Sequence, residues 1–160
     1  MIRDATPGDI PAIMTIWNNA VRDTVATFSS EEKTEAGLSA LLTERRANYA
    51  FYVAEQDGAI DGFATYGQFR AGNGYRHTFE NTIYLAASAR GKGTGRALMA
   101  AVEDHARSIG GHSMIAAVTG SNTPAIAFHK ALGYTTTALL PQAGYKFDLW
   151  HDLLLMQKLL

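Results

Sequence analysis

The chain contains no cysteine. This absence excludes disulfide bonds, zinc–thiolate and iron–sulfur sites, and cysteine nucleophiles. The sequence also lacks an excess of charge, since 14 basic and 15 acidic residues give a formal net charge of −1. Without a strong electrostatic field, we expect no binding to nucleic acid or to an anionic membrane. No apolar run approaches the roughly 20 residues of a membrane span, and the N-terminus lacks a signal-peptide core, so we expect a cytoplasmic protein.

The composition is that of a folded domain. The chain has 160 residues, of which 47% are hydrophobic. This length suits a single hydrophobic core, and no linker, repeat or low-complexity segment divides the chain. We therefore predict one domain over residues 1–160.

Hydrophobic periodicity predicts strands and helices in the order β-α-α-β-β-β-α-β-α-β-β. Helices are expected from the Thr6-Pro7-Gly8-Asp9 start, over 34–46, after Gly95 and over 122–132. Strands are expected over 2–5, 51–55, 60–69, 75–85, 113–118, 134–139 and 149–159. This mixed order predicts an α/β fold in which helices cover both faces of one sheet.

A glycine-rich turn lies between a predicted strand and a predicted helix. Gly91, Gly93 and Gly95 alternate there, so backbone N–H groups can turn toward one point without obstruction by Cβ atoms. The following helix adds its free N–H groups and the positive end of its dipole. Three cations flank the turn: Arg90, Lys92 and Arg96. The turn predicts a site for a phosphate-bearing ligand, although its spacing matches neither a P-loop nor a Rossmann fingerprint. The alternative is a flexible turn with incidental charges.

Two motifs resemble those of one enzyme family. Arg90-x-x-Gly93-x-Gly95 resembles the pyrophosphate loop of the GNAT N-acetyltransferases, and the segment from Asn122-x-x-Ala125 to Leu132-Gly133-Tyr134 is similar to the family's downstream motif. The predicted element order resembles theirs over nearly the whole chain. The resemblance implies the GNAT fold, with a mixed, mostly antiparallel sheet.

Further stretches look like one subfamily, the phosphinothricin acetyltransferases. They are residues 75–85, 129–134, 143–146 and 150–152. That subfamily acetylates the α-amine of phosphinothricin, methionine sulfoximine or related amino acids, and its members are usually homodimers. The resemblance implies these properties for this chain as expectations.

The resemblance also implies acetyl-CoA as co-substrate. The residues implied to bind it are Leu85, Ala86, Ala87, Arg90, Lys92, Gly93, Thr94, Gly95, Arg96, Ala97, Leu98 and Asn122. In the family, the backbone around Leu85 donates to the thioester oxygen and pairs with the pantetheine arm. We expect no metal, because the remaining histidines have no metal-ligand spacing.

Glu80 is the first candidate for the catalytic base. Strand alternation places it on a polar face with Thr78, Thr82 and Tyr84. A partly desolvated carboxylate has a raised proton affinity and can accept a proton near neutral pH. The subfamily resemblance implies the same role. The alternatives are an exposed carboxylate or an ion pair with Arg76.

His129 is the second catalytic candidate. It stands four residues before Gly133, where many GNAT enzymes carry a tyrosine that protonates the thiolate. An imidazole can donate or accept a proton near neutrality. The alternative is a histidine that packs or bonds the cofactor. Tyr134 is another candidate donor, although a tyrosine in that place more often packs.

An amino-acid substrate needs a cation for its carboxylate. By resemblance, the substrate-side residues are Phe28, Tyr75, Arg76 and His77. Arginine can bind a carboxylate with two parallel hydrogen bonds. The alternative is that these charged residues lie in solvated loops. Two other functions stay open: acetylation of a peptide or protein, and a non-catalytic acyl-CoA sensor.

Overall fold

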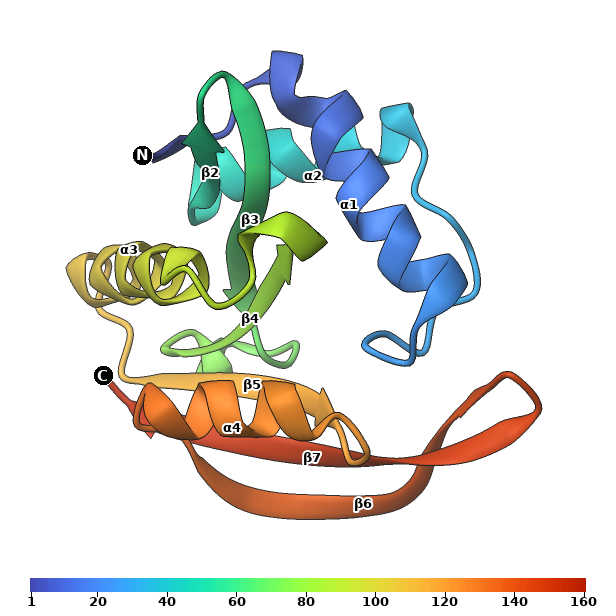
Figure 1. Cartoon of the computed structure of the whole chain (residues 1–160). Coiled ribbons are helices and arrows are strands. Elements are labelled where there is room, and N and C mark those ends of the chain that lie inside the picture. Colours follow the sequence, from blue (N-terminus) through green and yellow to red (C-terminus); the bar gives the residue numbers. More distant parts are fainter.

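The computed structural model describes residues 1–160 as one seven-stranded sheet with helices on both faces (Figure 1). The strand order is β1-β2-β3-β4-β5-β7-β6, and only the β4–β5 pair is parallel. The strands are β1 (Ile2–Asp4), β2 (Phe51–Gln56), β3 (Ala59–Gln68), β4 (Thr78–Leu85), β5 (Ser113–Thr119), β6 (Thr135–Lys146) and β7 (Leu149–Leu159). The predicted mixed, mostly antiparallel α/β fold is confirmed.

Four α-helices cover the sheet, with two hydrophobic cores between the layers. The helices are α1 (Ile10–Asp23), α2 (Glu35–Asn48), α3 (Thr94–Ser108) and α4 (Thr123–Ala131), joined by the short 3-10 helices η1 (Pro7–Asp9), η2 (Asn73–Tyr75) and η3 (Ala87–Ala89). α3 and α4 pack on one core, which includes Leu98 and Met114. α1 and α2 pack on the other, which includes Trp17 and Phe63. None of the helices is both long and apolar enough to cross a bilayer.

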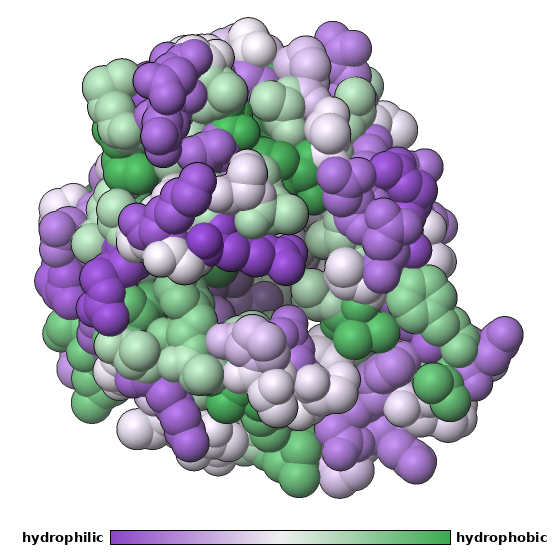
Figure 2. Space-filling view, viewed as in Figure 1, coloured by the Kyte–Doolittle hydropathy of each residue, from purple (hydrophilic) through white to green (hydrophobic).

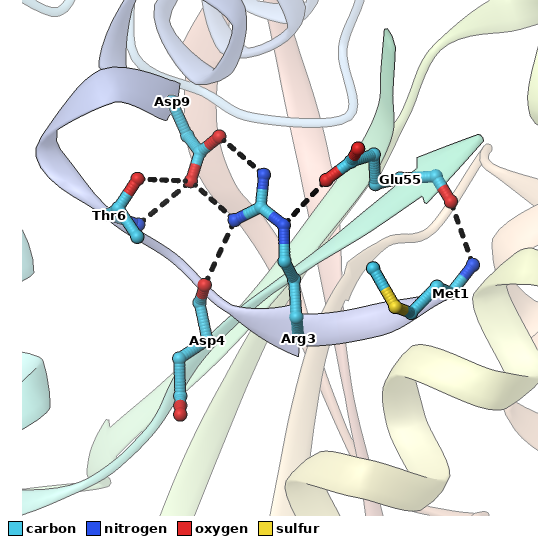
Figure 3. Close-up of polar contacts among 6 residues, drawn as sticks. All are labelled: Met1, Arg3, Asp4, Thr6, Asp9 and Glu55. Atoms are coloured by element: carbon cyan, nitrogen blue, oxygen red, sulfur yellow. Dashed lines mark hydrogen bonds and ion pairs between the residues drawn. The ribbon is translucent and has the colours of Figure 1, made fainter. Parts of the chain in front are cut away.

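The predicted start of the first helix is confirmed, and an ion-pair network fixes it to the sheet. The Thr6 N–H donates to the Asp9 carboxylate at 2.8 Å, so one 3-10 turn precedes α1. Arg3 on β1 donates to both Asp9 oxygens at 2.8 Å and to Glu55 at 2.6 Å (Figure 3). The Arg3 guanidinium lowers the pKa of Asp9 to about 2. The N-terminal end of α1 is therefore anchored to the edge of the sheet.

Two strand predictions are wrong at one boundary. The strand predicted from residue 75 begins at Thr78, because pairing with β3 ends there and Gly72, at φ 108, opens a 3-10 turn instead. The strand predicted to end at 139 continues to Lys146. Pro141 is tolerated within β6 because β6 is the edge strand and its outer side needs no partner. Register shifts on either side of Leu140 absorb the irregular residues.

Candidate active site

The centre of the sheet opens between β4 and β5. Their ladder has only three pairs and ends at Glu80↔Ile115, while β4 continues to Leu85 (Figure 1). The Ala86 N–H donates to the Asp61 carbonyl on β3. Because successive backbone N–H groups of a strand point to opposite sides, the Leu85 N–H points toward the gap between β4 and β5. Figure 2 shows the surface hollowed at the centre of this view, between the upper and lower halves of the molecule. The structure thus provides an open strand edge with a backbone donor at Leu85.

The glycine-rich turn follows directly and begins α3. Gly91 and Gly93 adopt left-handed backbone angles, with φ +74 and +84, and Gly93 is the residue that precedes α3. A Cβ at either glycine would meet nothing within 4 Å, so the turn faces open space. Gly95 differs, because a Cβ there would approach the Phe128 ring at 3.0 Å. That glycine permits α3 to pack against α4.

The other predicted cofactor residues fall into distinct environments. Arg90, Lys92 and Arg96 are exposed and make no ion pair within the chain. The Leu98 side chain is fully buried in the core and is not available to a ligand. The Asn122 side chain accepts from the Ala125 N–H at 3.2 Å and caps α4. The small or partly exposed residues of the set border the turn: Ala86, Ala87, Thr94 and Ala97. The free cations and open backbone suit an anionic ligand.

Glu80 lies at the last pair of the β4–β5 ladder, where the sheet opens. Its side chain is partly buried, and it makes no hydrogen bond or ion pair within the chain. The alternative pairing with Arg76 does not occur, because the Arg76 guanidinium donates to the Asn73 carbonyl at 3.2 Å. Burial raises the pKa of the Glu80 carboxyl. A carboxylate of this kind is suited to accept a proton.

His129 is 5% exposed and its two ring nitrogens differ. Nδ1 lies 2.9 Å from the Ala125 carbonyl oxygen. Since a carbonyl only accepts, Nδ1 carries a proton, and Nε2 of the neutral ring carries a lone pair. Nε2 is buried and has no partner. Burial lowers the pKa of His129, so the ring favours its neutral form. The free nitrogen can therefore accept a proton first and donate it only afterwards.

Tyr134 is engaged in a buried polar cluster that sequence reasoning missed. Its hydroxyl donates to Glu103 on α3 at 3.0 Å, and Lys158 donates to the same carboxylate at 2.6 Å. Burial raises the pKa of Tyr134, which weakens it as an acid. Glu103 stands among the apolar positions Met99, Val102 and Ala106, so a charge within an apolar helical stripe was the available signal.

The substrate-side residues are not brought together. Phe28 packs against the β6–β7 hairpin, with its ring 5.8 Å from that of His151. Tyr75 and Arg76 are exposed in the turn before β4, and no hydrogen bond joins them to Glu80. His77 is also exposed and lies beside Gly110 at the end of α3. No group of three His, Asp or Glu side chains is placed to hold a metal ion.

This chain is similar to known proteins in sequence and in fold. Residues 13–134 match the model of the acetyltransferase (GNAT) family. A relative from Salmonella typhimurium, described as an L-methionine sulfoximine/L-methionine sulfone acetyltransferase, is 37% identical over 98% of this chain and 92% of its own length.

Two solved structures share the whole fold. A phosphinothricin acetyltransferase from Sinorhizobium meliloti, in complex with acetyl-CoA, has a TM-score of 0.95 and 34% identity over 100% of this chain and 88% of that one. A ribosomal-protein-alanine N-acetyltransferase from Brucella melitensis has a TM-score of 0.96 and 39% identity over 100% of this chain and 99% of that one. The similar proteins therefore include enzymes named for free amino acids and one named for a protein.

Proposed function

This chain belongs to the acetyltransferase (GNAT) family, and from that premise we infer an acetyl-CoA-dependent N-acetyltransferase of small amino-acid-like substrates. The acceptor is the α-amine of methionine sulfoximine, phosphinothricin or a related amino acid. The observation that carries this proposal is the unpaired, partly buried Glu80 at the point where β4 and β5 separate.

The glycine-rich turn and the open edge of β4 form the binding site for acetyl-CoA in this proposal. Arg90, Lys92 and Arg96, with the first N–H groups of α3, bind the phosphates of acetyl-CoA. The backbone of Leu85, Ala86 and Ala87, at the end of β4, binds the pantetheine arm. The Leu85 N–H, directed into the gap, donates to the thioester oxygen as negative charge develops there.

Glu80 prepares the nucleophile. An α-amine has a pKa of about 7.7 to 8.0 in solution, so much of it is protonated at neutral pH. The Glu80 carboxylate takes a proton from this ammonium, directly or through a water molecule. The amine nitrogen then forms a bond to the acetyl carbon, and the bond between that carbon and the CoA sulfur breaks.

His129 completes the proton balance. After attack, the nitrogen still carries a proton that the amide product does not need, and the leaving thiolate needs one. Nε2 has no partner within the chain, so we propose that its lone pair takes up this proton and passes it to the sulfur once the bound thioester reaches the buried ring. Tyr134 is a weaker candidate, because its hydroxyl is already donated to Glu103.

The acceptor site lies on the face of β4 that carries Glu80. The family resemblance assigns Phe28 to one wall of it and Tyr75 and Arg76 to the acceptor carboxylate. The structure does not bring these side chains together, and His77 lies beside Gly110 at the end of α3. Arginine can bind a carboxylate with two parallel hydrogen bonds, and Arg76 makes no ion pair within the chain.

The β6–β7 hairpin supports a homodimer. It extends beyond the body of the protein (Figure 1), and large apolar side chains are exposed along it: Leu139, Leu140, Tyr145, Phe147, Leu149 and Trp150. An exposed patch of this kind marks a protein interface. The double variant L149E/W150E should sediment as a monomer where the wild type sediments as a dimer. Ile109→Glu, which alters an exposed apolar residue elsewhere, should remain dimeric.

Acetylation of a peptide or protein is the second candidate, because the similar Brucella melitensis structure is named a ribosomal-protein-alanine N-acetyltransferase.

A cytoplasmic location is also part of the main proposal.

The test is the release of CoA thiol from acetyl-CoA over a panel of amines. The panel holds methionine sulfoximine, methionine sulfone, phosphinothricin, common amino acids, polyamines and peptides with N-terminal alanine. Release with the first three compounds supports the proposal, and release with peptides alone replaces it with protein acetylation. Binding of acetyl-CoA without release for any amine would favour the sensor.

A further inference from the structure

Lys146, the last residue of β6, is a buried lysine without a carboxylate partner. It is 4% exposed, and its Nζ donates to two carbonyl oxygens, those of Thr24 at 2.6 Å and Thr27 at 2.9 Å. Burial lowers the pKa of Lys146. A buried ammonium is costly unless its protons are hydrogen-bonded, so a lysine in this place calls for a specific role.

Its two acceptors both belong to the loop between α1 and α2, residues 24–34. Thr24 directly follows α1 as its C-terminal capping residue, where the helix dipole is negative and favours a cation. The same loop is tied to β5, because the Thr119 hydroxyl donates to the Val25 carbonyl. It follows directly from α1, whose Trp17 ring lies 5.6 Å from the Tyr84 ring on β4. The loop thus joins β5, on one side of the gap in the sheet, to the helix that packs on β4, on the other side.

Phe28 follows Thr27 directly and is held by the same hairpin. Its ring lies on Gly144, where a Cβ would come within 2.3 Å of it. It also stacks on His151 with an interplanar angle of 19°. Gly144 and His151 oppose each other across β6 and β7, and His151 Nε2 donates to the Lys146 carbonyl at 2.8 Å. Gly144 and His151 therefore form the surface on which Phe28 packs, and Lys146 holds the neighbouring residue Thr27 and accepts from His151.

The face of β4 on which α1 packs is the one that carries Glu80, since the Trp17 ring contacts Tyr84. Tyr84 and Glu80 are separated by four positions, so alternation places both on the same side of the sheet. The loop that Lys146 holds therefore extends from the helix that covers the strand face on which the acceptor amine must meet its base.

We propose that Lys146 is a positioning residue for acceptor recognition: it fixes the α1–α2 loop so that Phe28 forms a rigid wall of the acceptor site. This inference rests on the proposed function, because it takes the Phe28 side of the molecule to receive the acceptor. Lys146 acts through Phe28 and takes no part in acetyl transfer. Gly144 contributes to the same positioning of Phe28, since only a residue without a Cβ leaves room for the Phe28 ring.

The test combines hydrogen exchange with steady-state kinetics on the full chain. Lys146→Met keeps the length of the side chain and removes its donors, whereas Lys146→Arg keeps donors. Lys130→Met, an exposed lysine on α4, is the matched control. In K146M, amides of residues 24–34 should exchange at least about tenfold faster and the KM for methionine sulfoximine should rise about tenfold, since the lost hydrogen bonds are charged. The KM for acetyl-CoA should stay within about twofold.

Rescue and a second variant separate positioning from general loss of structure. Lys146→Arg should recover part of the acceptor KM. Gly144→Ala displaces the Phe28 ring while leaving Lys146 in place, and it should raise the acceptor KM in the same way, so the idea stays testable if K146M folds poorly. An unchanged loop exchange in K146M would overturn the anchoring, and faster exchange with an unchanged acceptor KM would overturn the role in recognition. If the wild type acetylates no amino acid, the proposed function fails instead, while the exchange data still report on the anchoring.

Discussion

The two sides of the active site are built in different ways. The cofactor side is local: one strand end, one glycine-rich turn and the first turn of α3 lie within residues 80–98. The acceptor side is assembled from distant parts of the chain, since Lys146 and Thr27 are separated by 119 positions. Variants on each side should therefore affect the binding of acetyl-CoA and of the acceptor separately.

The largest expected effect is at Glu80, where the two sides meet. Glu80→Gln should lower kcat by about 100-fold or more, because general bases contribute factors of this size. Since burial raises the pKa of Glu80, the wild-type rate should fall as the pH drops through that raised pKa, and the variant should lack this limb of the profile. Affinity for acetyl-CoA should be unchanged by calorimetry. The exposed control Glu35→Gln should retain full activity, and a fully active E80Q enzyme would remove Glu80 from the mechanism.

The next effect isolates the cofactor side. Gly93→Val should weaken acetyl-CoA binding by at least about tenfold, because a β-branched residue is strained in the left-handed region by roughly 1 to 3 kcal/mol. Its side chain would also enter the open space that the phosphates use. Gly74→Val is the matched control, since that glycine also faces open space but has no positive φ. Equal affinity in calorimetry for both variants would contradict the assignment of the turn.

A smaller effect tests the other end of α1, which is anchored by Asp9 rather than by Lys146. Asp9→Asn should lower the free energy of unfolding by about 1 to 2 kcal/mol at pH 7. Arg3 lowers the pKa of Asp9 to about 2, so this stabilisation is complete above the ordinary carboxyl pKa and is lost as the pH falls through about 2. Urea unfolding should therefore show a gap between variant and wild type that narrows toward pH 2.

Asp9→Asn should leave the KM for the acceptor unchanged. This result would distinguish the anchoring of α1 by Asp9 from the anchoring of the α1–α2 loop by Lys146. Asp57→Asn, an exposed carboxylate in the β2–β3 turn, should change neither quantity. An acceptor KM that rises in D9N as much as in K146M would show that general stability, and not the loop contact, controls recognition.

The smallest effect concerns Tyr134. Tyr134→Phe should lower stability by about 1 kcal/mol, because it removes a hydrogen bond to the buried Glu103 carboxylate. Its kcat should stay within about twofold of the wild type, since the hydroxyl is committed to Glu103. A loss of kcat by more than about tenfold would identify Tyr134 as the proton donor and take that role from His129.

The contrast between local structure on the cofactor side and long-range contacts on the acceptor side also explains what could be predicted from the sequence. The capped start at Thr6 and the strand–turn–helix around Gly93 depend on neighbouring residues, so local patterns predicted them. The strand alternation that places Glu80 on one face with Thr78, Thr82 and Tyr84 was also predictable, because β4 is a regular strand from Thr78 onward.

Long-range features could not be predicted in that way. Pro141 and Gly144 are typical of turns, yet β6 continues through them because its outer edge has no partner strand. Nothing near Lys146 in the sequence indicates that its ammonium is buried against carbonyl groups of a loop near the start of the chain. Likewise, Phe28 was expected in the acceptor site by resemblance alone, and its seat on Gly144 and His151 is visible only in the folded chain.

The most direct test of the central claim compares two acceptors with the same enzyme. kcat/KM should be measured at saturating acetyl-CoA for methionine sulfoximine and for a peptide with N-terminal alanine. We predict a value at least about 100-fold higher for the free amino acid, because a site built to bind a carboxylate leaves charged groups unpaired with the peptide. A higher value for the peptide would contradict the claim and identify the chain as a protein acetyltransferase with the same fold and cofactor.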